Sequence, residues 1–148
     1  MQKLFKFGER LSELMLYADN IKSDRLGEAV GVNGSTIRLW ITGSRNPSLQ
    51  NAVKLADYFR CPLNFLFGRS DDEKLDFTPQ PVLPFYERFV AILKERGKSW
   101  YKVSKDTKIS KSNIQDWRDG REPLMPILID IANYLDITLD YLVGRDRE

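Results

Sequence analysis

The stretch SDRLGEAVGVNGSTIRLWITG, from Ser23 to Gly43, decides the fold of this chain. In its first half, Leu26 and Val30 share one face of a helix, and a glycine follows directly. In its second half, Ile37 and Trp40 repeat the helical spacing before another glycine. The stretch therefore predicts two short helices that are joined by a tight turn.

The second half of this stretch recurs near the other end of the chain. STIRLWITG, residues 35–43, matches SNIQDWRDG, residues 112–120, at Ser, Ile, Trp and Gly. Other identities follow in the same order, while their offset falls from 78 to 77 to 76. This order predicts two copies of one domain, with the shared Ile and Trp in the core. We call them copy one, residues 1–69, and copy two, residues 85–148.

A segment of different composition separates the copies. SDDEKLDFTPQPVLP, residues 70–84, is acidic at first and then carries three prolines. Proline removes a backbone donor and blocks helix formation, so an extended linker is expected here. Fifteen extended residues can span roughly 45–50 Å.

Helical spacing without strand-like alternation runs through both copies, and it predicts an all-α protein with five short helices in each copy. Ser23, Ser48 and either Asn33 or Ser35 are the expected N-caps, and Pro62 is expected to start a helix. The helices of copy one are expected near residues 8–18, 23–30, 33–42, 49–59 and 62–67. Those of copy two are expected near residues 85–96, 99–106, 110–118, 125–135 and 138–143.

The composition excludes several classes of function. The chain has no histidine, which removes histidine metal sites and histidine-dependent catalysis, and it has no nucleotide-binding glycine motif. Cys61 is the one cysteine, so an internal disulfide is ruled out and a cytoplasmic protein is expected. Neither a signal peptide nor a membrane-spanning apolar run is evident. We expect no enzyme, no metal or other cofactor, and no small-molecule ligand.

The stretch from Ser23 to Ser48 resembles the Cro and phage-repressor type of helix-turn-helix, the lambda-repressor-like or XRE family. The turn Gly31-Val32-Asn33 and the ending Trp40-Ile41-Thr42-Gly43 carry the resemblance. In this family the second helix of the motif enters the major groove, where its N-terminal residues meet base edges. The resemblance implies a nucleoid-associated transcriptional regulator that binds double-stranded DNA, a repressor of phage, mobile-element or stress-gene type.

The resemblance implies a small and weakly polar set of base-reading residues in copy one. Gly34, Ser35 and Leu39 occupy the base-reading positions, and Arg38 and Arg45 are the expected phosphate partners. A solvated surface charge is the alternative interpretation of each arginine. The full expected set is Ser23, Asn33, Gly34, Ser35, Thr36, Arg38, Leu39 and Arg45.

The corresponding set in copy two is more polar and more basic. Lys111, Ser112 and Asp116 occupy the reading positions, where a lysine can donate to guanine and a carboxylate can accept from cytosine. Seven basic and three acidic side chains lie between Lys98 and Arg121, against four and two between Lys22 and Arg45. The full expected set is Trp100, Lys102, Ser110, Lys111, Ser112, Asn113, Gln115, Asp116, Arg118 and Arg121.

Two arrangements on DNA remain open. A single chain can act as a built-in heterodimer on an asymmetric site, because the linker tethers the second copy near the first. Alternatively, chains pair into a homodimer through the last helices, where Phe65, Phe67, Tyr141 and Leu142 form either an association surface or the closing part of each core.

A different function also remains open. A helix-turn-helix fold can serve as a protein-interaction module, such as an antirepressor or antitoxin, with at most one copy that reads DNA. The lean reading set of copy one favours this alternative, whereas the basic face of copy two opposes it.

Overall fold

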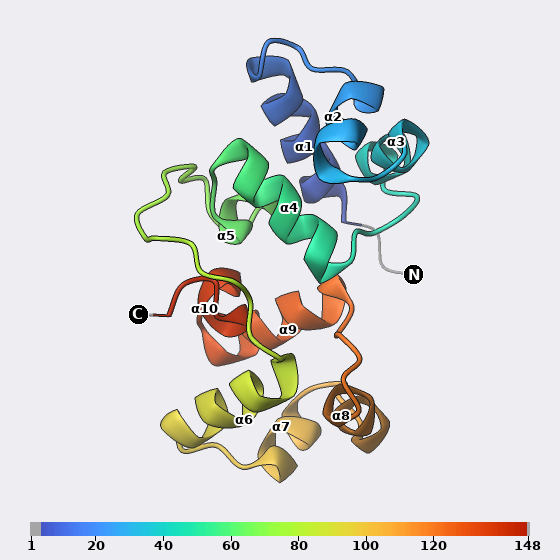
Figure 1. Cartoon of the computed structure of the whole chain (residues 1–148). Helices are drawn as coiled ribbons and strands as arrows, with labels where there is room; N and C mark the ends of the chain where they lie inside the picture. Colours follow the sequence, from blue (N-terminus) through green and yellow to red (C-terminus); the bar gives the residue numbers. More distant parts are fainter. Residues whose placement is uncertain (1–3, 148) are drawn as a thin grey trace. The chain divides into compact units, whose positions relative to one another are not determined.

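Ten α-helices and no β-strand are present in residues 4–147, the part of the chain that the computed structural model describes (Figure 1). Copy one contains α1 (Phe5–Tyr17), α2 (Ser23–Val30), α3 (Gly34–Thr42), α4 (Leu49–Phe59) and α5 (Leu63–Leu66). Copy two contains α6 (Phe85–Glu95), α7 (Trp100–Asp106), α8 (Lys111–Arg118), α9 (Met125–Leu135) and α10 (Leu139–Val143). The predicted all-α fold, with five helices in each copy, is confirmed.

Each copy has its own aromatic core, and matched residues build both cores. In copy one the rings of Phe7 and Trp40 meet edge to face, with centroids 6.3 Å apart. In copy two the rings of Phe85 and Trp117 meet in the same way at 5.1 Å. Only 1% of Trp40 and 4% of Trp117 is exposed, so the prediction that both tryptophans are core residues is confirmed. Of the two shared isoleucines, Ile37 is buried but Ile114 is only half-buried, so the core prediction for Ile114 is wrong.

Most helix ends lie close to their expected positions, but the expected caps differ in detail. Ser48 accepts a hydrogen bond from the Asn51 amide at 3.1 Å, as predicted for an N-cap. The prediction for Ser23 is wrong, because Lys22 takes the N-cap position and Ser23 is the first residue of α2. Asn33 occupies the N-cap position of α3, but its side chain makes no capping hydrogen bond.

The turn between the two motif helices is built differently in the two copies. In copy one, Gly31 adopts a left-handed conformation with φ of 80°. The chain then passes so close to Gly27 that a Cβ there would lie 2.4 Å from the Val32 carbonyl oxygen. In copy two, the hydroxyl of Thr107 donates to the Val103 carbonyl at 2.7 Å. A side-chain hydrogen bond thus fixes the turn that glycine geometry fixes in copy one.

The first residue of the predicted linker is held by copy one. The Ser70 amide donates to the Asn64 carbonyl at 3.2 Å, and Arg10 donates to the Ser70 carbonyl at 3.3 Å. The Ser70 hydroxyl in turn accepts from the Asp72 amide at 3.1 Å. The chain therefore leaves copy one in a defined direction at Ser70.

The proline-rich part of the predicted linker is held by copy two. The amides of Gln80 and Leu83 donate to the carbonyls of Arg145 and Val143 at 2.8 and 3.1 Å. Arg147 donates to the Pro81 carbonyl at 2.7 Å. We call residues 77–84 the strap, since these contacts fasten them along the end of copy two.

The chain forms two compact units, of which the first ends at Asp76 and the second begins at Phe77. We call residues 71–76, between Ser70 and the strap, the joint. Its six residues can span only about 20 Å. The linker limits 70–84 stay a prediction, but the reach of roughly 45–50 Å for a fully extended linker does not apply while the strap is bound.

The last helices close the core of each copy. Phe65, Phe67 and Leu142 are almost fully buried. Tyr141 is half-buried, and its hydroxyl donates to Glu95 at 2.7 Å. Phe65, Phe67 and Leu142 therefore pack into the cores, whereas part of Tyr141 stays exposed; a homodimer remains a prediction.

Candidate nucleic-acid interface

Copy one presents α3 on a scaffold that buries the inner face of that helix. Ile37 and Trp40 are buried, whereas Ser35, Arg38 and Leu39 point outward and are exposed. Residues four apart on a helix share a face, so Ser35 and Leu39 lie on the same side. The other expected contacts of copy one are exposed at Asn33 and Arg45 and half-buried at Ser23 and Thr36.

Gly34, one of the expected base readers, is buried and not presented to solvent. A Cβ at Gly34 would lie 1.8 Å from a carboxylate oxygen of Asp24 and 2.9 Å from its Cα. Asp24 comes from α2 and also pairs with Arg38, whose Nη1 lies 3.4 Å from the carboxylate. Gly34 thus packs against Asp24, and Arg38, an expected phosphate contact, is paired with the same carboxylate.

Copy two starts its recognition helix with a capping box. The Ser110 hydroxyl accepts from the Asn113 amide at 3.3 Å, and the Asn113 side chain accepts from the Ser110 amide at 2.9 Å. Both side chains were expected to contact DNA. Their hydrogen bonds fix the N-terminus of α8, so their structural role is to position that helix.

Most other polar groups of α8 are held by neighbours. Arg121 pairs with Asp116 at 3.0 Å. Gln115 donates to Asp119 at 3.2 Å. Arg118 lies over the ring of Tyr86 at 5.3 Å and donates to its hydroxyl at 3.3 Å, so this arginine is restrained by α6.

Lys111 and Ser112 are the exception on α8. Both are exposed, and within residues 4–147 neither side chain makes a hydrogen bond or an ion pair. They occupy the first two positions of the helix, where backbone N–H groups point outward and the helix dipole is positive. This end of α8 therefore offers an exposed lysine and a hydroxyl, neither of which has a side-chain partner within residues 4–147, beside outward-pointing backbone donors.

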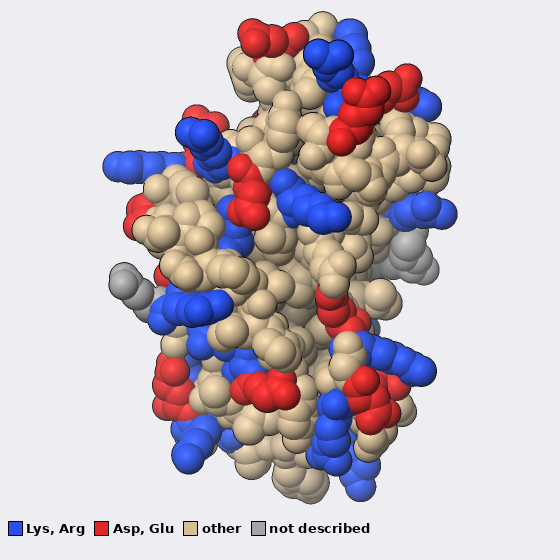
Figure 2. Space-filling model, viewed as in Figure 1, with Lys and Arg blue, Asp and Glu red and all other residues tan. Residues whose placement is uncertain are grey.

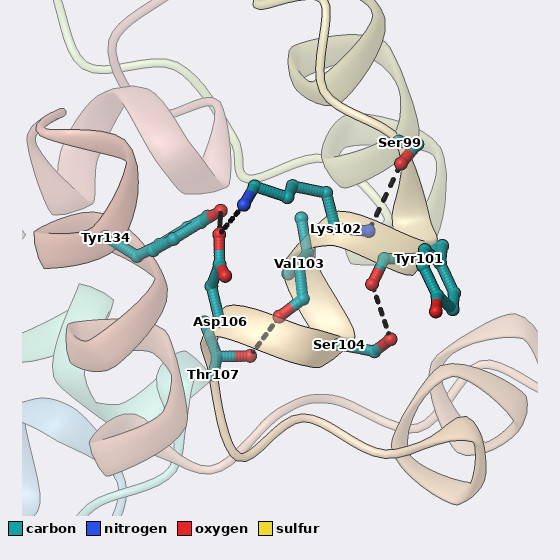
Figure 3. A network of polar contacts seen from close by, with 8 residues as sticks. All are labelled: Ser99, Tyr101, Lys102, Val103, Ser104, Asp106, Thr107 and Tyr134. Atoms are coloured by element: carbon teal, nitrogen blue, oxygen red, sulfur yellow. Dashed lines mark hydrogen bonds and ion pairs between the residues drawn. The ribbon is translucent and has the colours of Figure 1, made fainter.

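A polar network ties α7 to α9 (Figure 3). The Tyr134 hydroxyl donates to Asp106 at 2.6 Å, and Lys102 pairs with the same carboxylate at 3.3 Å. The Tyr134 hydrogen bond is the main cause that lowers the pKa of Asp106, and the same bond raises the pKa of Tyr134. Lys102, an expected DNA contact, is thus also part of the scaffold.

Further cations of copy two lie against aromatic rings. Lys105 stands over the ring of Tyr101 at 4.9 Å, and Lys98 over the ring of Tyr134 at 5.2 Å. Tyr101 is 65% exposed on α7. Trp100, an expected contact in the same helix, is half-buried and is its first residue.

The charges on the molecular surface are mixed and do not form a single-sign patch on the face shown in Figure 2. Blue and red groups alternate over both copies. Ion pairs such as Arg121 with Asp116 and Lys102 with Asp106 place opposite charges side by side within copy two. The charges at individual positions of the recognition helices are therefore a better guide to the DNA contacts than the net charge of the chain.

Sequence reasoning missed three residues that shape the interface. Asp24 and Tyr86 each hold an expected contact residue through a side-chain interaction, and Tyr134 holds Asp106, the acid that pairs with the expected contact Lys102. Asp24 stands at the second position of α2, so the sequence alone shows an acid within the motif. The two tyrosines act from α6 and α9, and only a three-dimensional arrangement brings them to the motif.

Two groups of features are absent from the described residues. No cluster of three or more potential metal ligands is found among them. None of their helices is long and apolar enough to cross a membrane.

Comparison with known proteins agrees with this geometry. The helix-turn-helix family model matches twice, at residues 11–66 and 91–142, which together make up more than half of the chain. No curated protein and no solved structure gave a significant match. The family is one of DNA-binding regulators rather than enzymes. The chain therefore belongs to the lambda-repressor-like helix-turn-helix family, and it carries two copies of the family's domain in tandem.

Proposed function

We propose that this chain is a sequence-specific transcriptional regulator, a repressor, that places two different recognition helices on one duplex. The observation that carries the proposal is the exposed start of α8, where Lys111 and Ser112 stand beside outward-pointing backbone donors. Guanine O6 and N7 accept from lysine, and phosphate oxygens accept from a hydroxyl or an amide. Such a regulator acts in the cytoplasm, on nucleoid DNA.

The two copies would read dissimilar half-sites. Copy one offers Ser35 and Leu39, a hydroxyl and an apolar group that suits a thymine methyl. Copy two offers Lys111, Ser112 and Gln115 at its exposed positions. One chain thus provides the two halves that homodimeric members of a helix-turn-helix family provide with two chains.

The joint gives this arrangement a limited reach. Because the joint spans only about 20 Å, the second copy stays near the first and its effective concentration on adjacent DNA is high. Tethering of this kind strengthens binding without any contact between the copies. A dimer of chains is not required for two half-sites to be read.

The test is the salt dependence of duplex binding by the full chain. Fluorescence anisotropy with a labelled duplex of mixed sequence should show affinity that falls steeply with salt, with a logarithmic slope on the order of −4 for four to five phosphate contacts. Lys111→Ala should weaken binding and reduce the slope by about one. Lys74→Ala, which removes the same charge from the joint, is the control and should leave both unchanged. A flat salt dependence would contradict the proposal.

One observation favours a second function, recognition of a protein by copy one. Leu39 is 38% exposed, and the nearby Arg38 is already paired with Asp24. An exposed apolar residue beside a neutralised charge suits a protein partner, as in an antirepressor or antitoxin. Under that function Leu39→Ser would abolish capture of the partner and would leave duplex binding by copy two intact.

A further inference from the structure

Asp24 has an unusual place for an acid in a DNA-binding motif. Its carboxylate lies directly against Gly34, the first residue of recognition helix α3, where a Cβ would be only 1.8 Å from the nearer carboxylate oxygen. The side chain is nevertheless 83% exposed. An exposed negative charge therefore stands at the end of α3 that a major groove would meet first.

The carboxylate also changes the groups around it. It lies 3.4 Å from Nη1 of Arg38, the cation of α3 nearest to this end. It further compensates the positive end of the helix dipole, which would otherwise attract phosphate. One acid thus offsets two features that draw a duplex toward copy one.

Copy two lacks this arrangement at the matching positions, 77 residues further on. Tyr101 replaces Asp24, Lys111 replaces Gly34, and Gln115 replaces Arg38. The start of α8 therefore carries an unpaired lysine, whereas the start of α3 is a glycine with the Asp24 carboxylate of α2 against it. The side-chain charge beside the start of the recognition helix is thus positive in copy two and negative in copy one.

We infer that Asp24 is a specificity-determining residue that suppresses binding of copy one to arbitrary duplex. This inference rests on the proposed DNA-binding function. Copy two supplies sequence-independent affinity, whereas copy one binds only where base contacts outweigh the repulsion between Asp24 and the phosphate backbone. Binding to a wrong sequence is then held by one copy, and binding to the correct site by both.

The test compares Asp24→Asn with Glu28→Gln in the full chain. Glu28 is an exposed acid near the other end of α2, so its variant removes the same charge away from α3. On a duplex of unrelated sequence, Asp24→Asn should raise affinity about fivefold and steepen the salt slope by about one, because Arg38 becomes free for a phosphate. Glu28→Gln should change affinity less than about twofold.

A second variant, Arg38→Gln, tests whether Asp24 acts through its pairing with Arg38. Arg38→Gln should cost less affinity for arbitrary duplex in the native chain than in the Asp24→Asn background, because Asp24 offsets part of the charge of Arg38. In the Asp24→Asn background it should remove the gain, which a double-mutant cycle measures directly. Thermal melting of each variant establishes that copy one is folded. If Asp24→Asn melts early, Asp24→Ser takes its place in the same cycle with Arg38→Gln.

The outcomes separate this inference from the proposed function. If the native chain shows no salt-dependent duplex binding, the proposed function fails. If the native chain binds but Asp24→Asn and Glu28→Gln behave alike, the inference is wrong and the proposed function stands. A loss of affinity in Asp24→Asn would also overturn the inference, since it would make Asp24 a contact that DNA uses.

Discussion

The pair of Asp140 and Arg145 allows a strong prediction for copy two. Their side chains are 2% and 0% exposed and lie 2.8 Å apart, which is the geometry of a buried ion pair. The guanidinium also lies over the ring of Phe77 in the strap at 5.6 Å. Removal of one partner of a buried pair leaves a charge in the protein interior and costs about 3–5 kcal/mol.

Copy one contains a half-buried version of the same contact in which the acceptor is uncharged. At the matching positions, 76 residues earlier, Arg69 donates to the side-chain oxygen of Asn64. Asp140→Asn keeps an acceptor for the guanidinium but removes the charge that compensates it, so it should be destabilising, though less so than Asp140→Ala. Asp140→Ala removes the acceptor and should show the full cost.

The assay is thermal unfolding combined with residue-resolved hydrogen exchange. A loss of about 3 kcal/mol lowers the melting temperature of a domain of this size by at least about 12 °C. Amides of copy two and of the strap should lose protection in Asp140→Ala, whereas amides of copy one should keep theirs. If Asp140→Ala melts within a few degrees of the native chain, the buried pair does not stabilise copy two as argued.

Three further predictions concern the network, the turn and the joint. Because the pKa of Asp106 is lowered, its contact with Tyr134 stabilises the fold fully at pH values above the usual pKa of 3.8. This stabilisation is lost as the pH falls through the lowered pKa. Tyr134→Phe should therefore lower the melting temperature near neutral pH but not in strong acid. Gly27→Ala should destabilise copy one by about 1–3 kcal/mol in denaturant titrations, because its Cβ would meet the Val32 carbonyl at 2.4 Å. Half-sites moved apart by two helical turns, about 68 Å, should be bound by one copy only in footprints, and a Gly-Ser insertion in the joint should restore the second.

The fold followed from the sequence because the pattern that specifies it is local and is written twice. Helical spacing around Ile37 and Trp40 marks the buried face of α3, and glycines mark the ends of its motif helices. The repeated Trp117 fixed the second domain in the same way. Short-range periodicity was enough to predict which segments are helices. The observed helices differ from the expected ones at their ends and in the N-cap of α2, which is Lys22 and not Ser23.

The interface could be predicted only in part, because partners from other helices decide which groups are free. Nothing local to Arg118 shows that Tyr86 of α6 holds it, or that Asp24 of α2 reaches Arg38. The strap is a similar case. Prolines indicated an extended segment, but the hydrogen bonds that fasten Gln80 to Arg145 join positions far apart in the chain.

Selection of bound fragments from a random duplex library, followed by footprinting of the selected site, tests most directly whether one chain reads two different half-sites through α3 and α8. The selected site should contain two dissimilar half-sites at a single spacing, one lost in Ser35→Ala and the other in Lys111→Ala. A palindromic site would contradict it, since chain dimers with one reading copy produce that pattern, and the absence of any enriched fragment at low salt would contradict DNA reading altogether.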